Sequence, residues 1–568
     1  MIPLALWLAL AAPADGSWQQ ALDQAARVEE IIDSLSLPQQ VGQLLIVGFG
    51  GTEMGPEISR LLSRLHPGGV LLFDRNVRNN QQLCALIRGV REAMADEVQP
   101  FVAIDQEGGN VVRVREKVLV VPGAMSLGAT RDPAMAYLAG QGSAIDLGLI
   151  GIDMNLAPVL DINRAAENPV INVRAFGDRA ENVARLGLPY LLGQQHGGAI
   201  TVAKHFPGHG TTRSDSHFDL PRIDLGIEEL RQVELAPFRQ AFAAQLDAVM
   251  LAHVQVPALD PDGLPASLSP RVIDGLLRRE MGFAGLVITD DLEMRAITDR
   301  GGVGAAAVQA IRAGADQIMV LWTQRKKEEA FQALAAAVQD GTISSERLRE
   351  SLRRILSLKL RRGTLEALSR PACADLALLP NPFHQRLAQA AAARGLTLVK
   401  NDGLLPLCPG RKLVAAAPYP AFLAALRARL PQTRTLALAR NPSAAQRQRE
   451  LETLLQMTAD GETVIIGVAN AYQARLAQEF YQKSQRPLLV VSFGSPYWLK
   501  YFPRVAGYLC TYSYQIEAQQ AAAAAIAGER SLTGRLPVTL SEEYPNGFGV
   551  MLPAGGCRKD AAPSRGSP

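Results

Sequence analysis

Residues 199–206 read AITVAKHF, and residues 285–291 read GLVITDD. Each is a continuous apolar run that turns polar at its carboxyl end. A run without alternation predicts a strand buried on both faces, and therefore a parallel sheet covered by helices. Six further runs of this type lie nearby: QLLIVGF (43–49), GGVLLFD (68–74), FVAIDQE (101–107), IDMNLAP (152–158), DAVMLAH (247–253) and DQIMVLW (316–322).

Amphipathic stretches separate the eight runs, so strand and helix alternate over about 300 residues, as expected for a (β/α)₈ barrel of the TIM type. In such barrels the carboxyl ends of the strands form the active-site face. Five of the runs end in ionisable residues, which predicts a polar mouth on the barrel. These residues are Asp74, Asp105, Lys204 with His205, His253 and Asp290.

The pattern changes after the barrel. Residues 323–362 are helical and well charged, and a proline-containing linker follows. A second alternation then predicts a smaller open α/β sheet with helices on both faces, an αβα sandwich. Its expected strands are KLVAAA (412–417), TRTLAL (433–438), TVIIGVA (463–469), PLLVVSF (487–493), GYLCTYS (507–513) and RLPVTL (535–540). The predicted organisation is a signal peptide at 1–14, a barrel at 22–365, a linker at 366–386, a sandwich at 387–554 and a disordered tail at 555–568.

Composition narrows the class of protein. The 568-residue chain is 48% apolar and 20% charged, with a net charge of +3. This charge is too small for its length, and basic residues too scattered, to predict nucleic-acid binding. The first residues, MIPLALWLALAAPA, form an apolar run that leads into an A-x-A-like site, which predicts export to the periplasm or the extracellular space, with a cytoplasmic location as the alternative. No other stretch could span a membrane.

The cysteines show no metal-binding spacing. Five of them are scattered along the chain, with no C-x-x-C pair, so we expect free buried thiols rather than a disulfide framework or a zinc site. They are Cys84, Cys373, Cys408, Cys510 and Cys557.

Three of the seven histidines lie in one loop, KHFPGHGTTRSDSH, at positions 204–217. A zinc site of His205, His209 and His217 is one interpretation, although the spacing fits no usual ligand pattern. Polar bracing of a long loop is the second, above all for His209. The third is a catalytic acid/base, because Asp215 two residues before His217 can hold the imidazole and stabilise its charged form.

Together, the loop KHFPGHG…DSH and the strand LVITDD resemble glycoside hydrolase family 3, and the Asp-x-His loop resembles its β-N-acetylglucosaminidase branch. The resemblance covers nearly the whole chain after the N-terminal apolar run, including LTLVKNDGLLPL (396–407) and LTGRLPVTL (532–540) in the second domain. It implies that Asp290 is the nucleophile and that His217, held by Asp215, is the acid/base. Glu293 departs from the pattern, because a small residue is commoner there.

The same resemblance implies a set of sugar-binding residues. The segment AIDQEGGNVVRV (103–114) is similar to the family's D-Q-E-G-G segment, and NPVINVRAFG (168–177) to another family segment. Asp105 or Arg174 could instead be half of a structural ion pair, and Met250 could be a core residue. The implied substrate-binding residues are Asp105, Arg113, Arg174, Lys204, His205 and Met250.

The activity implied by the resemblance is a retaining exo-β-N-acetylglucosaminidase that needs no cofactor or metal. A phosphorylase using the same residues, a family β-glucosidase or β-xylosidase, and a carbohydrate-binding protein with an inactive site are the alternatives. The expected partner is a carbohydrate substrate. The sequence leaves the natural aglycone, the choice between hydrolysis and phosphorolysis, and the oligomeric state open.

Overall fold

The computed structural model describes residues 18–215, 219–369, 373–459 and 461–555. Its first part is a closed barrel of eight parallel strands in the order β1 to β8, and β8 pairs with β1 through Leu45 and Ile318. All eight predicted runs form these strands, so the predicted barrel is confirmed. The strands are β1 (Leu45–Val47), β2 (Gly69–Leu72), β3 (Phe101–Ile104), β4 (Met154–Asn155), β5 (Ile200–Phe206), β6 (Ala248–Leu251), β7 (Leu286–Asp291) and β8 (Gln317–Val320).

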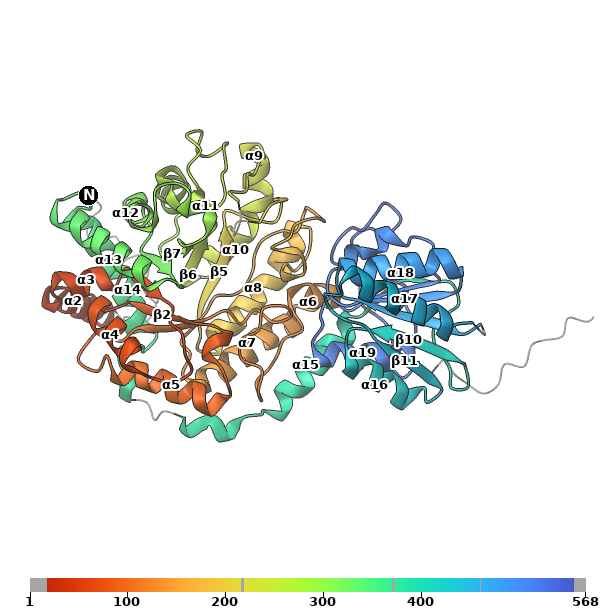
Figure 1. The fold of residues 1–568 in the computed structure, drawn as a ribbon. Helices are drawn as coiled ribbons and strands as arrows, with labels where there is room; N and C mark the ends of the chain where they lie inside the picture. The colour runs from red at the N-terminus through yellow and green to blue at the C-terminus, as the bar shows by residue number, and fades with distance from the viewer. Residues whose placement is uncertain (1–17, 216–218, 370–372, 460, 556–568) are drawn as a thin grey trace, which may run out of the picture.

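Helices surround the barrel (Figure 1), and two precede it. Their ends follow the usual signals: Asp132 accepts hydrogen bonds from the backbone of Ala134 and Met135 before α7, and Gly151 ends α7 in a left-handed conformation. The helices are α2 (Trp18–Ser34), α3 (Leu37–Gly42), α4 (Pro56–Leu65), α5 (Asn80–Glu92), α6 (Ala124–Thr130), α7 (Pro133–Ile150), α8 (Ala180–His196), α9 (Ile227–Glu229), η3 (Leu230–Glu234), α10 (Ala236–Ala243), η5 (Arg271–Glu280), α11 (Arg295–Thr298), α12 (Val303–Ala313), α13 (Gln324–Gln339) and α14 (Ser345–Arg361).

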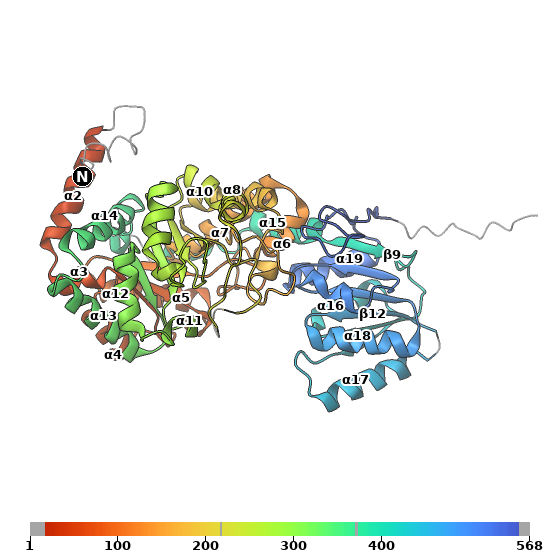
Figure 2. The same cartoon turned by 90° about the horizontal axis from the view of Figure 1, so that it is seen from above.

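The second domain is a six-stranded sheet in the order β11-β10-β12-β13-β14-β9, with only β9 antiparallel. Residues of β10 alternate between two cores: Val414 and Ala416 pack with α17 and α18, and Leu413 and Ala415 pack with α16 and α19. Helices therefore cover both faces (Figures 1 and 2), as predicted. The elements are α15 (Pro382–Gly395), β9 (Thr397–Asn401), β10 (Leu413–Ala417), α16 (Pro420–Arg429), β11 (Thr433–Ala437), α17 (Ala444–Met457), β12 (Thr463–Val468), α18 (Ala471–Ser484), β13 (Leu488–Ser492), η8 (Pro496–Tyr501), β14 (Gly507–Cys510) and α19 (Ile516–Ile526).

One predicted strand is wrong. Residues 535–540 (RLPVTL) form no strand, and β9 is the sixth strand instead. Pro537 has no N–H to donate to a sheet, and its carbonyl oxygen accepts a hydrogen bond from Asp178 of the barrel domain. Gly177 permits this approach, because a Cβ there would lie 2.6 Å from that oxygen. The segment joins the two domains rather than extending the sheet.

The expectation of free thiols is wrong for three cysteines, Cys84, Cys373 and Cys408. Cys84 on α5 and Cys373 in the linker form a disulfide with a Cα–Cα distance of 5.8 Å, across 289 residues of sequence. The two are brought together because the chain returns from α14 along the α5 side of the barrel (Figure 1). Cys408 is disulfide-bonded as well, whereas Cys510 is free and buried.

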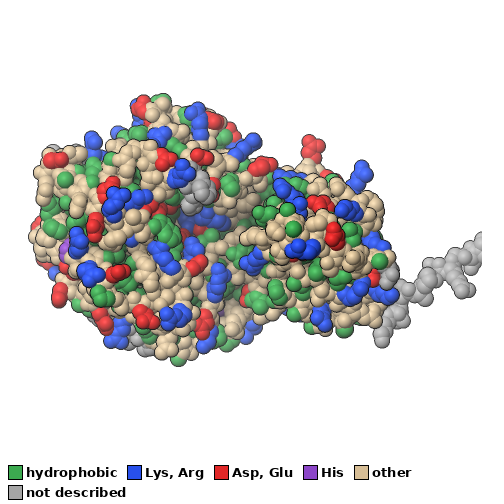
Figure 3. Space-filling view, viewed as in Figure 1, with side chains coloured by type: hydrophobic (Ala, Val, Ile, Leu, Met, Phe, Trp, Pro, Cys, Tyr) green, Lys and Arg blue, Asp and Glu red, His purple; other side chains and the backbone are tan. Residues whose placement is uncertain are grey.

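Apolar contacts join the two domains. Met125, Ala129 and Val173 of the barrel domain belong to the same buried cluster as the α17–α18 face of the sheet. Figure 3 shows the surface hollowed where the two domains meet. No helix in the described part of the chain combines the length and the apolar composition needed to cross a membrane.

Candidate active site

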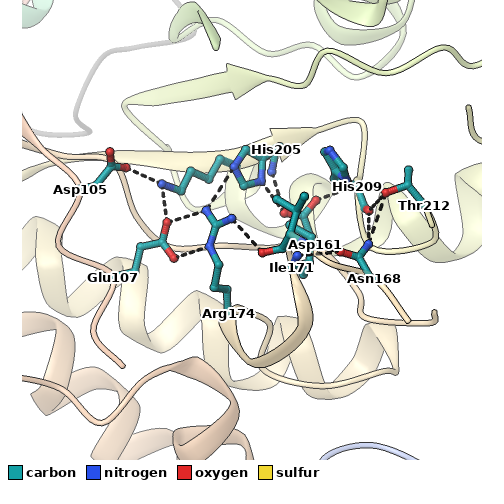
Figure 4. Close-up of polar contacts among 11 residues, drawn as sticks. Asp105, Glu107, Asp161, Asn168, Ile171, Arg174, His205, His209 and Thr212 are labelled. Carbon is teal, nitrogen blue, oxygen red and sulfur yellow. Dashed lines mark hydrogen bonds and ion pairs between the residues drawn. The ribbon is translucent and has the colours of Figure 1, made fainter. Parts of the chain in front are cut away.

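A cluster of charged side chains lies at the carboxyl ends of β3 and β5. Lys204 Nζ lies 2.7 Å from Asp105 Oδ1 and 2.6 Å from Glu107 Oε1. Arg174 holds the same Glu107 in two parallel bonds, Nε–Oε2 at 2.9 Å and Nη2–Oε1 at 2.8 Å (Figure 4). Glu107 is therefore the residue that ties the two cations together.

Local backbone features aim these side chains. Gly108 and Gly109 follow Glu107 with φ of +92° and +54°, and a Cβ on Gly108 would lie 2.6 Å from the Val121 carbonyl oxygen. Only glycine fits this turn, which explains the D-Q-E-G-G sequence. On β5, the register against β6 shifts between Ala203 and Phe206. Such an irregularity re-aims side chains.

Electrostatics favour the charged forms of Glu107, Lys204 and Arg174. Burial alone would raise the pKa of Glu107, but the neighbouring Arg174 and Lys204 lower it far below its ordinary value. Burial likewise opposes the charges of Lys204 and Arg174, and their carboxylate partners raise both pKa values. Two cations and two carboxylates thus face one another at the barrel mouth, an arrangement suited to binding hydroxyl groups in fixed positions.

A second charged group lies beside the first. His205 Nδ1 lies 2.6 Å from Asp161 Oδ2, and the backbone N–H of His209 donates to Asp161 Oδ1 at 2.6 Å. Burial would raise the pKa of Asp161, but His205 and His209 lower it. The other ring nitrogen of His205 lies 3.5 Å from Arg174 Nη2, which connects the two groups.

His209 has a structural environment. Its Nδ1 lies 2.8 Å from Thr212 Oγ1, and its carbonyl oxygen accepts a hydrogen bond from Asn168 Nδ2. Burial lowers its pKa to about 4, so the ring is neutral at pH 7. These contacts agree with the interpretation that His209 braces the loop. No group of three or more metal-ligating side chains suited to an ion occurs among the described residues.

Asp290 and Asp291 end β7. Asp290 is half-buried, and its Oδ1 accepts the backbone N–H of Asp291 at 2.8 Å. Asp291 is 6% exposed, and burial raises its pKa to about 7. Its carboxylate accepts the N–H of Glu293, and its carbonyl oxygen lies 3.0 Å from His253 Nε2. The two neighbouring carboxyl groups thus have different environments, as their alternation along the strand predicts.

Glu293, the departure from the family pattern, holds the end of the neighbouring strand. Its Oε1 accepts the backbone N–H groups of Trp322 and Thr323 at 2.6 and 2.8 Å. The Trp322 ring is exposed at 55%, packs on Phe73 with ring centroids 4.8 Å apart, and covers the guanidinium of Arg75. Glu293 therefore fixes an aromatic rim next to the end of β7.

The remaining predicted residues lie in three different places. Arg113 Nη1 lies 3.5 Å from Asp74 Oδ2 and its Nη2 lies 3.9 Å from Asp105 Oδ2, which puts it at the edge of the cluster. Met250 is buried in the barrel core on β6. Asp215 is half-buried in the loop after β5. His217 lies outside the described residues.

Sequence reasoning did not select two residues of the cluster, Glu107 and Asp161. Glu107 stands in the quoted D-Q-E-G-G segment, where two glycines after a buried strand signal a turn that returns a carboxylate to the mouth. Asp161 follows β4 within the buried stretch APVLDIN, and a charged residue among apolar ones is the signal that could have found it.

Comparison with known proteins agrees with this geometry. Residues 36–358 match the glycosyl hydrolase family 3 N-terminal domain. Beta-hexosaminidase A from Pseudoalteromonas piscicida is 36% identical over 387 residues, which cover 64% of this chain and 64% of that protein. A beta-hexosaminidase from Alkalilimnicola ehrlichii is 38% identical over 49% of this chain and 80% of its own length. The structure of a family 3 beta-N-acetylglucosaminidase from Paenibacillus sp. str. FPU-7 superposes with a TM-score of 0.85 at 36% identity, over 89% of this chain and 99% of that one.

The chain therefore belongs to glycosyl hydrolase family 3, and the resemblance seen in its sequence is confirmed. It is a glycoside hydrolase with a two-domain architecture shared with its structural relatives.

Proposed function

We propose that the chain is a retaining exo-β-N-acetylglucosaminidase that releases terminal β-linked N-acetylhexosamine. The observation that carries the proposal is that the cluster of Lys204, Asp105 and Glu107, with Arg174 bound to Glu107, and the carboxylate of Asp290 stand at the carboxyl ends of β5, β3 and β7 of one barrel. The beta-hexosaminidase relatives support the substrate class.

In the first step, the Asp290 carboxylate attacks the anomeric carbon as the glycosidic C–O bond breaks. His217, in its protonated form and held by Asp215, gives its proton to the leaving oxygen. In the second step, neutral His217 takes a proton from water, the water oxygen attacks the anomeric carbon, and the ester to Asp290 breaks. The charged cluster holds the sugar hydroxyls and favours the cationic transition state.

The role of Asp290 is tested by substitution. Asp290→Ala should abolish hydrolysis of an aryl N-acetylglucosaminide while N-acetylglucosamine still binds, because Asp105, Arg174 and Lys204 remain. Asp291→Ala is the matched neighbour and should keep measurable turnover. Loss of activity in Asp291→Ala together with an active Asp290→Ala would show that the assignment of the nucleophile is wrong.

The natural substrate and the location follow as part of the proposal. Peptidoglycan and chitin fragments both carry terminal N-acetylglucosamine, and product analysis with peptidoglycan fragments against chitobiose distinguishes them. Export is supported by the apolar N-terminal run and by the Cys84–Cys373 disulfide, because such bonds persist in oxidising compartments. Fractionation of the cells that produce the protein tests it.

A further inference from the structure

A cavity of about 540 Å³ lies between the barrel domain and the sandwich domain. Asn110 and the loop that contains Asn168 and Asn172 line its barrel side, and loops of the C-terminal sheet line the rest. None of the predicted catalytic or sugar-binding residues lines it. Asn168 also donates a hydrogen bond to the His209 carbonyl oxygen, so the loop that lines the cavity contacts the loop after β5 as well.

The cavity lies where parallel sheets bind ligands. Its walls include Tyr419 after β10, Arg440 after β11, Asn470 after β12, Gly494 after β13 and Tyr514 after β14. All five strands are parallel, and the strand order reverses between β10 and β12. The crevice outside the carboxyl ends of the strands at such a reversal is the preferred ligand site of open α/β sheets.

The lining suits a sugar. Tyr419 and Tyr514 are nearly parallel, with ring centroids 6.4 Å apart and an interplanar angle of 11°. Trp498 adds a larger ring, and asparagine amides stand among the aromatic rings. Aromatic faces pack on the apolar faces of a pyranose, and amides bind its hydroxyl groups.

Two polar atoms in the lining have unused hydrogen-bonding capacity. Trp498 Nε1 and Asn172 Oδ1 are buried, and neither has a hydrogen-bond partner among the described residues. One is a donor and the other an acceptor. Leaving such groups unpaired is costly, so a polar ligand would be stabilised here.

The charge of Arg440 indicates which type of sugar the cavity would bind. The Arg440 guanidinium lies 5.1 Å from the centroid of the Tyr419 ring, and no carboxylate of the described residues lies within 4.0 Å of this guanidinium. Lys500, also in the lining, lies 3.8 Å from Glu167, which offsets its charge. The lining thus holds the Lys500–Glu167 pair and, beside the aromatic rings, Arg440 without a carboxylate within ion-pair distance among the described residues.

We propose that this cavity is a second saccharide-binding site, separate from the barrel site and selective for a sugar that carries a carboxylate. It gives the sandwich domain a binding role of its own. The aromatic rings hold the pyranose, and Arg440 pairs with its carboxylate.

The test compares two monosaccharides that differ by one carboxylate-bearing group, N-acetylmuramic acid and N-acetylglucosamine, by titration calorimetry on the full chain. We expect N-acetylmuramic acid to bind the wild type and to bind Arg440→Ala at least about tenfold more weakly, as expected for loss of a charged hydrogen bond. Trp498→Phe, which keeps a ring but removes the N–H, should also weaken it. Arg449→Ala, an exposed arginine of the same domain outside the cavity, is the control and should bind like the wild type.

Hydrolysis of an aryl N-acetylglucosaminide is measured in parallel, and its KM should be unchanged in both cavity variants. An increased KM would place the cavity in the reacting pocket and overturn the proposal. Equal binding of both sugars, with no effect of Arg440→Ala, would overturn it as well. Calorimetry measures binding without turnover. A chain that is inactive on the aryl substrate would therefore refute the proposed function, whereas the binding measurement would still test the cavity.

Discussion

Replacing Glu107 with glutamine should weaken both the fold and the site. The substitution keeps the shape of the side chain but removes the charge that Lys204 and Arg174 share, at distances of 2.6 to 2.9 Å. Removing one partner of a buried pair costs about 3–5 kcal/mol. Asp105 still accepts from Lys204, so we expect about 3 kcal/mol, a large part of a typical stability of about 5–15 kcal/mol.

The effect depends on pH in a defined direction. Because its partners hold the pKa of Glu107 far below the ordinary value, the charge stabilises the fold above the unfolded-state pKa of about 4.3. This stabilisation is lost as pH falls through the folded-state pKa. The difference between wild type and Glu107→Gln should therefore be full at pH 7 and shrink on acidification below about pH 4.

Urea denaturation at several pH values measures this difference, with Glu92→Gln as the control. Glu92 pairs with Arg88 at the exposed surface, so its loss should cost less than about 1 kcal/mol. In activity, kcat/KM of Glu107→Gln should fall at least about tenfold, because Arg174 and Lys204 lose their common support. A stability within 1 kcal/mol of the wild type at pH 7, together with unchanged kinetics, would refute this account of the cluster.

Four further outcomes are expected. Asp291→Asn should be more stable than the wild type by up to about 4 kcal/mol at pH 9 and by little at pH 4, because a carboxyl whose pKa is raised to about 7 destabilises the fold once it ionises; urea denaturation at the two pH values checks this. His217→Ala should slow substrates with poor leaving groups far more than activated aryl glycosides in a leaving-group series, and equal losses would exclude the acid role. In the wild type, inorganic phosphate should intercept the glycosyl-enzyme, and absence of sugar 1-phosphate at high phosphate would leave hydrolysis alone. A chain truncated near residue 365 should keep some turnover, although Met125, Ala129 and Val173 lose their apolar cover; a folded but fully inactive truncation would contradict this.

The barrel could be predicted because its signal is local. Each strand is a short run buried on both faces, so composition alone marks it, and the ionisable residue that ends the run marks the mouth. Lys204 and Asp105 were found in this way, and Arg174 was found from the family resemblance. Lys204 contacts Asp105, and Arg174 and Lys204 both bind Glu107. The prediction of a strand at 535–540 was wrong because an apolar run that contains a proline can pack against a neighbouring domain as well as form a strand.

Features that depend on distant partners left no such signal. Cys84 and Cys373 are separated by 289 residues, and nothing near either one indicates that the linker returns to α5. Asp161 is similar: its neighbours are apolar, and its function as the acceptor for His205 and for the His209 backbone exists only because β4 lies next to β5. Strand ends can thus be predicted from single segments, whereas the partners of a charged group require the order of strands in the sheet. The interdomain cavity also could not be predicted from single segments, because its lining comes from five strand ends and two barrel loops. The order of strands in the second sheet brings the strand ends together, and the packing of the two domains adds the barrel loops.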